Sequence, residues 1–439
     1  MDETHEVIPS AKRLVKSLRD IGYDFSTAIA DIIDNSIEAG ASEVDVSVGF
    51  YGDDSYVRIS DNGNGMSKEE LKEAMRYGSE REYGEDDLGK FGLGLKTASM
   101  SQCRCFSVAS KTNGEISSYS WNLNHIEKTN KWEILSLKEE TTIELINAPL
   151  SDHSGTVVLW ESLDRIISFK DPSGEAARKK LISMCRELEA YLGMVFHKFL
   201  SGEISGKNLT ISINGNPIQP WDPFARNEQD TKTLSPIKIK FVHDGSQDKI
   251  ILQPYILPSK DKFSSPEAFN HLSGPAGWNQ QQGFYIYRAH RLIQSGGWCG
   301  IRVRDEHTKL SRIELNFPPV FDNAFKINVA KMRTQLPIQI KEAIANAIRS
   351  PVLLAREYYD GEKRSTPTIL NNSPKNNQNY ISVPPIKQLD NIASKPGLPK
   401  MFTFDEIEQK ANELASGNEK EIISRIFRHL RKNLMEGEK

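Results

Sequence analysis

The chain has 439 residues, and its 56 Lys and Arg residues against 59 Asp and Glu give a formal net charge of −3. At about 150 residues per domain, this length predicts two or three domains that each bury a core. The balanced charge excludes a protein that coats nucleic acid through bulk positive charge, so DNA contact would require a local patch. The polar N-terminal residues lack a signal core, and no apolar run approaches the roughly 20 residues of a membrane span. We therefore expect a cytoplasmic protein without membrane contacts.

Four cysteines are too few for a disulfide framework. Cys103 and Cys105 are separated by one residue rather than by the two of a zinc knuckle, and no second pair follows at ligand spacing. Ordinary reduced thiols are expected.

The first 200 residues alternate between helical and strand patterns. Two helices are predicted between Ile8 and Ala39, with Ser10 and Ser26 as their N-caps. A capping box at Ser67 and Glu70 predicts a helix that extends through Met75. The other expected elements are strands at 44–48, 56–59, 106–109, 118–121 and 156–159, a helix from Lys96, and a long helix at 174–200.

A second part begins near Leu209 and also mixes strands with helices, which is typical of an α+β fold. A helix is predicted at 338–359, interrupted at Pro351. The other expected elements are strands at 209–213, 237–242, 250–257 and 283–287. We predict domains at 1–205 and 206–360, a flexible linker rich in Asn, Pro and Ser at 361–400, and a short helical tail at 401–439.

The first of three stretches that point to a nucleotide site is Asp31–Ala39. Because positions four apart share a helix face, Asp31 and Asn35 point toward one spot while Ile33 and Ile37 turn toward packing. A carboxylate beside a carboxamide can hold a water and a Mg²⁺ ion. A helix with polar surface residues is the alternative.

The second stretch, Ile59–Met66, directly follows a predicted strand. Gly63 and Gly65 permit a tight turn in which the backbone approaches a flat ligand closely. Asp61 offers an acceptor to an exocyclic amine such as that of adenine, and an ordinary turn is the alternative.

The third stretch is Leu88–Ser99, in which Gly89, Gly92 and Gly94 free a loop whose amides can face phosphate oxygens. Lys90 and Lys96 add positive charge. The glycine spacing fits neither a Walker loop nor a Rossmann fingerprint.

In this order, the three stretches resemble the GHKL ATPases, the group of DNA gyrase, heat-shock chaperones, histidine kinases and MutL. The resemblance implies a Bergerat-type ATP-binding α/β sandwich, a mixed sheet with helices on one face, with ATP and Mg²⁺ as cofactors. It implies that Asn35 coordinates Mg²⁺, that Asp61 binds the adenine amine, and that the third stretch forms a lid. Gly155-Thr156 is similar to a later family element that supports adenine through water. The expected nucleotide-binding residues are Asn35, Asp61, Gly63, Gly65, Met66, Gly89, Lys90, Phe91, Gly92, Leu93, Gly94, Lys96 and Thr156.

Within that superfamily, the chain most resembles the MORC-like branch, over about residues 8–360. The similar stretches are 75–80, 94–100, 213–218 and 287–293. In gyrase and MutL relatives the second domain is a transducer that sends a lysine to the γ-phosphate, so the resemblance implies a transducer-like α+β domain with Lys331 in that role. A solvated loop lysine is the alternative.

Asp31 departs from the family pattern, because ATP-hydrolysing relatives usually carry glutamate there. Aspartate is one methylene shorter, which places the carboxylate about 1.5 Å further from the water, whereas a general base must come within about 3 Å of it. We predict a slow ATPase with Asp31 as the base, directly or through a second water. Asp34 and Glu38 are alternatives, although Asp34 is expected to be a local helix partner.

The resemblance also implies what ATP does. ATP is expected to order the lid at 78–89 and to let two protomers associate through residues 1–24. An ATP-gated homodimeric clamp that acts on DNA or on a DNA-associated complex is favoured, and a chaperone-like ATPase that remodels a protein partner is the alternative. No nuclease, methyltransferase or zinc motif follows residue 361, so a separate effector protein is expected.

Overall fold

The computed structural model describes residues 5, 7–20, 22–78, 94–327, 334–361 and 380–382. The chain divides into two compact units at 1–383 and 384–439, and the second unit lies outside the described residues. The predicted tail at 401–439 and almost all of the predicted linker therefore stay predictions. Among the described residues, no helix is both long enough and apolar enough to cross a membrane.

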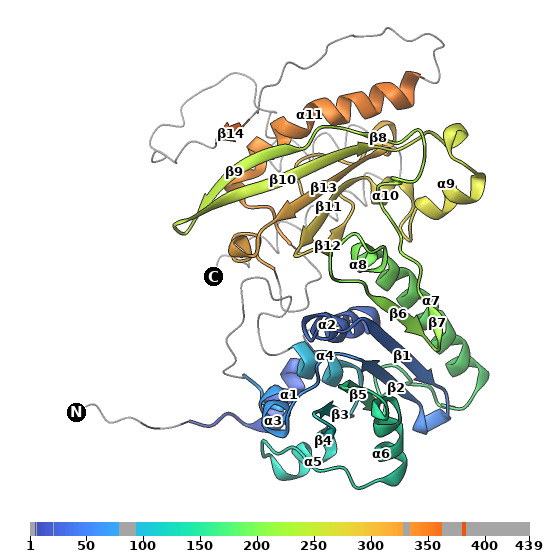
Figure 1. The fold of residues 1–439 in the computed structure, drawn as a ribbon, viewed down its shortest axis with the longest axis vertical. Helices are drawn as coiled ribbons and strands as arrows, with labels where there is room; N and C mark the ends of the chain where they lie inside the picture. The colour runs from blue at the N-terminus through green and yellow to red at the C-terminus, as the bar shows by residue number, and fades with distance from the viewer. Residues whose placement is uncertain are drawn as a thin grey trace, which may run out of the picture. The chain divides into compact units, whose positions relative to one another are not determined.

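Helices in the described part of the chain occur in both predicted domains (Figure 1). They are α1 (Ala11–Arg19), α2 (Phe25–Glu38), α3 (Lys68–Met75), α4 (Gly94–Gln102), α5 (Leu123–Thr129), α6 (Glu140–Asn147), α7 (Glu175–Val195), α8 (His197–Leu200), α9 (Pro266–Leu272), α10 (Trp278–Gln281) and α11 (Ile338–Gly361).

The first sheet is mixed and has the order β4-β3-β5-β2-β1-β6-β7. The β1–β6 pair is parallel, and the other neighbours are antiparallel. Its strands are β1 (Glu43–Gly49), β2 (Tyr56–Asp61), β3 (Cys105–Thr112), β4 (Glu115–Asn122), β5 (Gly155–Glu161), β6 (Thr210–Ile213) and β7 (Asn216–Pro217). The predicted α+β class, with a mixed sheet covered by helices, is confirmed.

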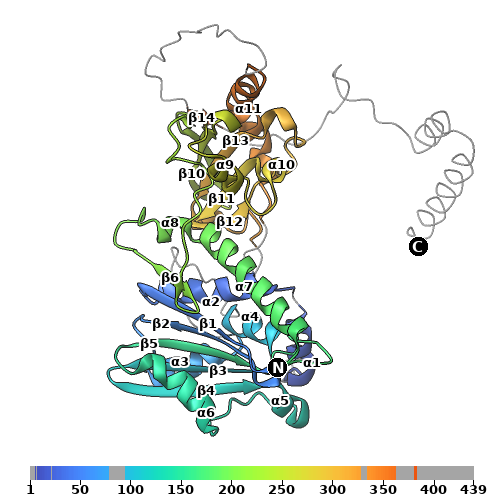
Figure 2. The same ribbon diagram turned by 90° about the vertical axis from the view of Figure 1, so that its right-hand side faces the viewer.

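Helices α2, α4 and α7 lie on one side of this sheet, as Figure 2 shows. Because strand side chains alternate between faces, Val158 and Trp160 enter the main core with the helices. Val157 and Leu159 face the other way and form a smaller core with Ile146 of α6. The prediction that helices lie on one face is therefore incomplete, because the short helix α6 packs on the opposite face.

The second sheet has the order β12-β11-β13-β10-β9-β14, and β8 pairs with β10. One face packs on α11, whose buried Ile340, Ile344 and Ile348 follow a helical spacing of four. The strands are β8 (Lys232–Thr233), β9 (Ile237–His243), β10 (Ser246–Ile256), β11 (Gly283–Arg288), β12 (Arg291–Ser295), β13 (Ser311–Phe317) and β14 (Tyr380–Ser382).

Most helix ends agree with the sequence analysis, but one cap was wrong. Ser10 caps α1, and Ser67 with Glu70 forms the predicted capping box of α3. The cap of α2 is Asp24 rather than Ser26, because the Asp24 carboxylate accepts from Thr27 N at 2.8 Å. The helix therefore begins one residue before Ser26.

Two further expectations differ from the structure. Strand β6 pairs with β1, so the strand at 209–213 extends the first sheet instead of opening the second domain. Helix α11 runs through Pro351 without interruption, with this proline buried. A proline inside a helix removes one hydrogen bond, and its ring crowds the carbonyl four residues earlier. The tertiary packing of α11 on the second sheet outweighs this cost.

Candidate functional site

Helix α2 places the first group of predicted site residues. Its Ile33 and Ile37 are buried in the main core, as the periodicity predicts. Asp31 is 2% exposed, whereas Asn35, one turn later, is exposed to solvent. The carboxylate is thus enclosed by protein while the carboxamide is accessible to a ligand.

Asp31 is held by a residue that the sequence analysis missed. The Tyr23 hydroxyl donates to Asp31 Oδ2 at 2.5 Å. Burial, together with the Asp31 charge, raises the pKa of Tyr23, so the hydroxyl stays protonated and donates at neutral pH. A Cβ added to Gly94 would lie 3.1 Å from Asp31 Oδ2. Asp31 therefore faces Gly94, which is the first residue of α4 and one of the glycines of the third predicted stretch.

Asp61, at the end of β2, is 8% exposed and accepts three hydrogen bonds. Its Oδ1 accepts from Gly63 N at 3.0 Å and Thr156 N at 3.1 Å, and its Oδ2 accepts from Ser36 Oγ at 2.8 Å. Burial raises the pKa of Asp61, and these hydrogen bonds only partly offset that effect. A carboxylate has about four acceptor sites, so one remains for a ligand amine.

The turn around Asp61 requires glycine at two positions. Gly65 has φ +70°, and a Cβ there would lie 2.0 Å from Lys111 O. Gly155 has φ +153°, and its Cβ would lie 1.9 Å from Asp61 O. The absent side chains let the loop after β2 approach β3 and β5 closely.

Ser110 of β3 joins the same cluster. Its hydroxyl accepts from Met66 N at 2.8 Å, donates to Gly155 O at 3.0 Å, and lies 2.9 Å from Thr156 Oγ1. The structure thus brings the predicted residues Asp61, Met66 and Thr156 together around one turn.

Lys96, another predicted site residue, has a contact outside the cluster of Asp61, Met66 and Thr156. Its side chain is buried in α4, and Nζ donates to Ala74 O at 2.9 Å. Burial lowers the pKa of Lys96 to about 8. Its predicted contact with phosphate stays a prediction.

The lowered pKa of Lys96 has a measurable consequence for stability. Lysine has a pKa near 10.5 in the unfolded chain, so between about pH 8 and pH 10.5 the unfolded state binds more protons. The free energy of unfolding of the wild type should therefore rise across this window by up to about 3 kcal/mol relative to Lys96→Met. Urea unfolding of both proteins at about pH 7 and about pH 10 measures this change. A difference that is independent of pH would contradict it.

The other predicted site residues lie outside the described residues. They are Gly89, Lys90, Phe91, Gly92, Leu93 and Lys331.

The donor set fits ATP with Mg²⁺. The described residues contain no cluster of three or more His, Cys, Asp or Glu side chains that could hold a metal alone. Mg²⁺ that arrives with a nucleotide needs only one or two protein ligands, because phosphates and waters supply the rest. Asn35 has an exposed carboxamide, which is an oxygen ligand of the kind that Mg²⁺ takes, and Asp61 keeps an acceptor site of the kind that an amine donor needs.

The two alternative bases on α2, Asp34 and Glu38, have surroundings that differ from those of Asp31. Asp34 was expected to be a local helix partner, and this expectation was wrong: Asp34 Oδ1 accepts from Arg291 Nε of the second sheet at 2.8 Å. An ion pair between residues 257 positions apart leaves no periodic signal in the sequence. Glu38 lies half-buried at the C-terminal end of α2.

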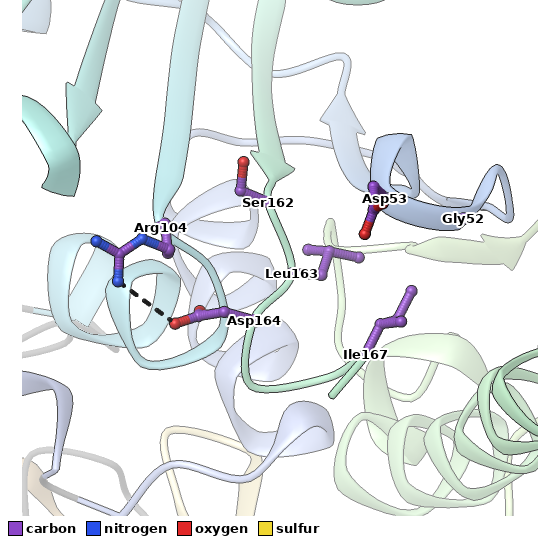
Figure 3. A pocket seen from close by; sticks show the side chains of 7 residues that line it. All are labelled: Gly52, Asp53, Arg104, Ser162, Leu163, Asp164 and Ile167. Carbon is purple, nitrogen blue, oxygen red and sulfur yellow. Dashed lines mark ion pairs between the residues drawn. The ribbon is translucent and has the colours of Figure 1, made fainter. Parts of the chain in front are cut away.

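A cavity of about 290 Å³ lies away from these residues, at the opposite end of β2 from Asp61 (Figure 3). Two of its charged groups, Asp164 and Arg104, already have partners, since Asp164 lies 2.6 Å from Arg19 and 3.8 Å from Arg104. We assign it no ligand. The lining residues are Gly52, Asp53, Arg104, Ser162, Leu163, Asp164 and Ile167.

Comparison with known proteins identifies the first domain. The family described as histidine kinase-, DNA gyrase B-, and HSP90-like ATPases matches residues 23–156, which contain Asp31, Asn35, Asp61 and Thr156. The DNA mismatch repair protein MutL of Shewanella loihica is 24% identical over 226 residues, which cover 50% of this chain and 32% of that protein.

Other MutL proteins match in the same way. MutL of Haemophilus influenzae is 26% identical over 219 residues, and MutL of Shewanella oneidensis is 28% identical over 217 residues. Each match covers 48% of this chain but only 30% of the relative.

The predicted superfamily is confirmed, and the MORC-like branch stays a prediction. Residues 23–156 therefore form an ATPase domain of the GHKL superfamily.

Proposed function

We propose that this protein binds ATP with Mg²⁺ and hydrolyses it slowly. The observation that carries the proposal is Asp61, a buried carboxylate that three donors hold in place at the end of β2 while one acceptor site stays open. Burying a carboxylate without a counter-ion is unfavourable, so a ligand that satisfies it explains why the residue is there.

In this proposal, Asn35 binds Mg²⁺, and the metal neutralises phosphate charge when the nucleotide is bound. Asp31 accepts the proton of the attacking water, with its carboxylate oriented by Tyr23. Aspartate is one methylene shorter than glutamate, so its carboxylate reaches the water less well and acts on it directly or through a second water. This step is therefore slow.

Replacing Asn35 tests the assignment of the site. Asn35→Ala removes the metal ligand, so Mg²⁺-dependent phosphate release should fall to background, by at least about 100-fold. Asn270→Ala is the matched control, because Asn270 is also exposed on a helix but lies in α9 of the second domain. Full activity of Asn35→Ala would exclude Asn35 from the site.

The finer features of the proposal come from the resemblance to the GHKL ATPases, which include gyrase and MutL. ATP orders the lid, Lys331 reaches the γ-phosphate, and two protomers associate through their N-terminal residues. Residues 79–93, which include most of the predicted lid, and Lys331 lie outside the described residues.

DNA is the proposed client, because the matched relatives bear the name of DNA mismatch repair proteins. One surface supports this choice. Lys238, Lys240 and Lys249 are exposed on β9 and β10, and Lys240 stands directly opposite Lys249. Exposed lysines on neighbouring strands can contact the phosphates of a DNA backbone.

Salt-dependent DNA binding tests this part of the proposal. We expect duplex DNA to bind at about 50 mM salt and to dissociate progressively up to about 200 mM. Lys240→Glu/Lys249→Glu should weaken binding and lower the salt slope by about 2. The matched control is Lys179→Glu/Lys180→Glu, which changes two exposed lysines of α7.

The same anisotropy measurement on chains with and without residues 401–439 separates the contribution of the tail. Loss of binding only in the shortened chain would assign DNA contact to the tail rather than to β9 and β10. No binding by any variant at about 50 mM salt would contradict a DNA client and favour remodelling of a protein partner.

A further inference from the structure

One buried ion pair connects the ATPase domain to the second sheet. Arg291 begins β12, and its Nε donates to Asp34 Oδ1 of α2 at 2.8 Å. The side chains are 1% and 0% exposed, respectively. In both ribbon views β12 lies beside α2 (Figures 1 and 2).

The position of Asp34 on α2 makes this pair relevant to the site. Asp34 lies between Asp31, which faces the start of α4, and Asn35, which is exposed. The next residue, Ser36, donates to Asp61. Residues 31–36 of α2 therefore carry the proposed base, the ion pair with the second sheet, the proposed metal ligand and the donor to Asp61.

Arg291 is itself held firmly. Its Nη1 donates to Leu292 O at 3.4 Å, and its guanidinium lies 5.8 Å from the Phe196 ring. The neighbouring strand β11 is anchored to α8, because Tyr287 OH lies 2.7 Å from His197 Nε2. Because Arg291 pairs with Asp34, a displacement of β12 would also displace α2.

Stability alone does not explain this ion pair. Replacing a buried ion pair with well-packed apolar residues of similar volume is often neutral or stabilising, whereas removing one partner is strongly destabilising. The pair is better explained by a need to hold α2 in one position relative to β12.

We propose that Arg291 is a positioning residue that couples the second domain to the ATP site through Asp34. The inference rests on the proposed ATPase function. Nucleotide bound beside Asp31 and Asn35 restrains α2 and thereby β12, and the position of β12 alters turnover because it sets the position of Asp31 on α2.

The experiment compares Arg291→Met, Asp34→Asn and the double variant in the full chain. Each single variant should lower the melting temperature, because it leaves one buried charge without its partner. The double variant should recover most of the melting temperature and bind ATP within about threefold of wild type. Its kcat for phosphate release should stay about 10-fold to 100-fold lower, because small misplacements of reacting groups are costly.

Hydrogen exchange gives a readout that a purely structural role would not change. In the wild type, a non-hydrolysable ATP analogue should protect the amides of β12, and in the double variant this protection should disappear. Arg312→Met is the control: Arg312 is also buried in the second sheet but donates to Pro223 O and Leu272 O. Assayed below its melting temperature, it should keep wild-type kcat and β12 protection.

Recovery of both kcat and β12 protection in the double variant would overturn the coupling role of Arg291. A wild type that binds no ATP would instead refute the proposed function and, with it, this inference. The two failures are distinguished by ATP binding to the wild type, which is measured first.

Discussion

Asp31→Asn should bind ATP almost as the wild type does but release phosphate about 100-fold to 1,000-fold more slowly. The amide has the shape of the carboxylate and can still accept from the Tyr23 hydroxyl, so the site keeps its geometry. It cannot accept the proton of the attacking water. Steady-state phosphate release and equilibrium ATP binding measure the two effects separately, and trapped ATP-bound dimers should appear by size.

Tyr23→Phe provides a graded comparison. It leaves the carboxylate in place but removes the hydroxyl at 2.5 Å, so we expect a smaller loss of turnover, about 10-fold, with ATP affinity unchanged. Tyr119→Phe, on β4 of the same sheet, should have no effect. If Asp31→Asn turns over ATP at the wild-type rate, Asp31 is not the base.

Local signals in the sequence predicted much of the ATPase domain. The spacing of Ile33 and Ile37 identified the buried face of α2, and Asp61 was correctly placed at the end of a strand before a glycine turn. These predictions succeeded because periodicity, capping and turn chemistry act between residues a few positions apart.

The contacts that complete the site could not be read in this way. Ser36 donates to Asp61 across 25 positions, and Arg291 reaches Asp34 across 257 positions. Such pairs form only because β2 and β12 pack beside α2, and a single sequence does not show which strands become neighbours. The parallel pairing of β6 with β1 was missed for the same reason.

Asp34 illustrates how a correct local rule gave a wrong assignment. An aspartate in mid-helix usually bonds to nearby backbone or to a side chain one turn away. Here the surface that covers α2 comes from the second sheet, and the buried guanidinium of Arg291 supplies the partner. Tertiary contact therefore outweighed the local preference.

Asp61→Asn should strongly weaken nucleotide binding while the fold remains intact. The Asn carbonyl can replace Oδ1 as the acceptor for Gly63 N and Thr156 N, and its amide can donate to Ser36 Oγ. The amide then presents a donor to the adenine amine, which is also a donor. The loss of a hydrogen bond to a charged group predicts about 100-fold weaker ATP binding, measured by calorimetry.

The stability of this variant separates recognition from folding. Burial raises the pKa of Asp61, which means that the folded chain disfavours the charged carboxylate. Removing that charge should therefore leave the free energy of unfolding unchanged or increase it. Ser36→Ala is the control, because it removes one donor but keeps the acceptor, and it should weaken ATP binding by about 10-fold or less. ATP binding by Asp61→Asn at wild-type affinity would exclude Asp61 as the residue that recognises adenine.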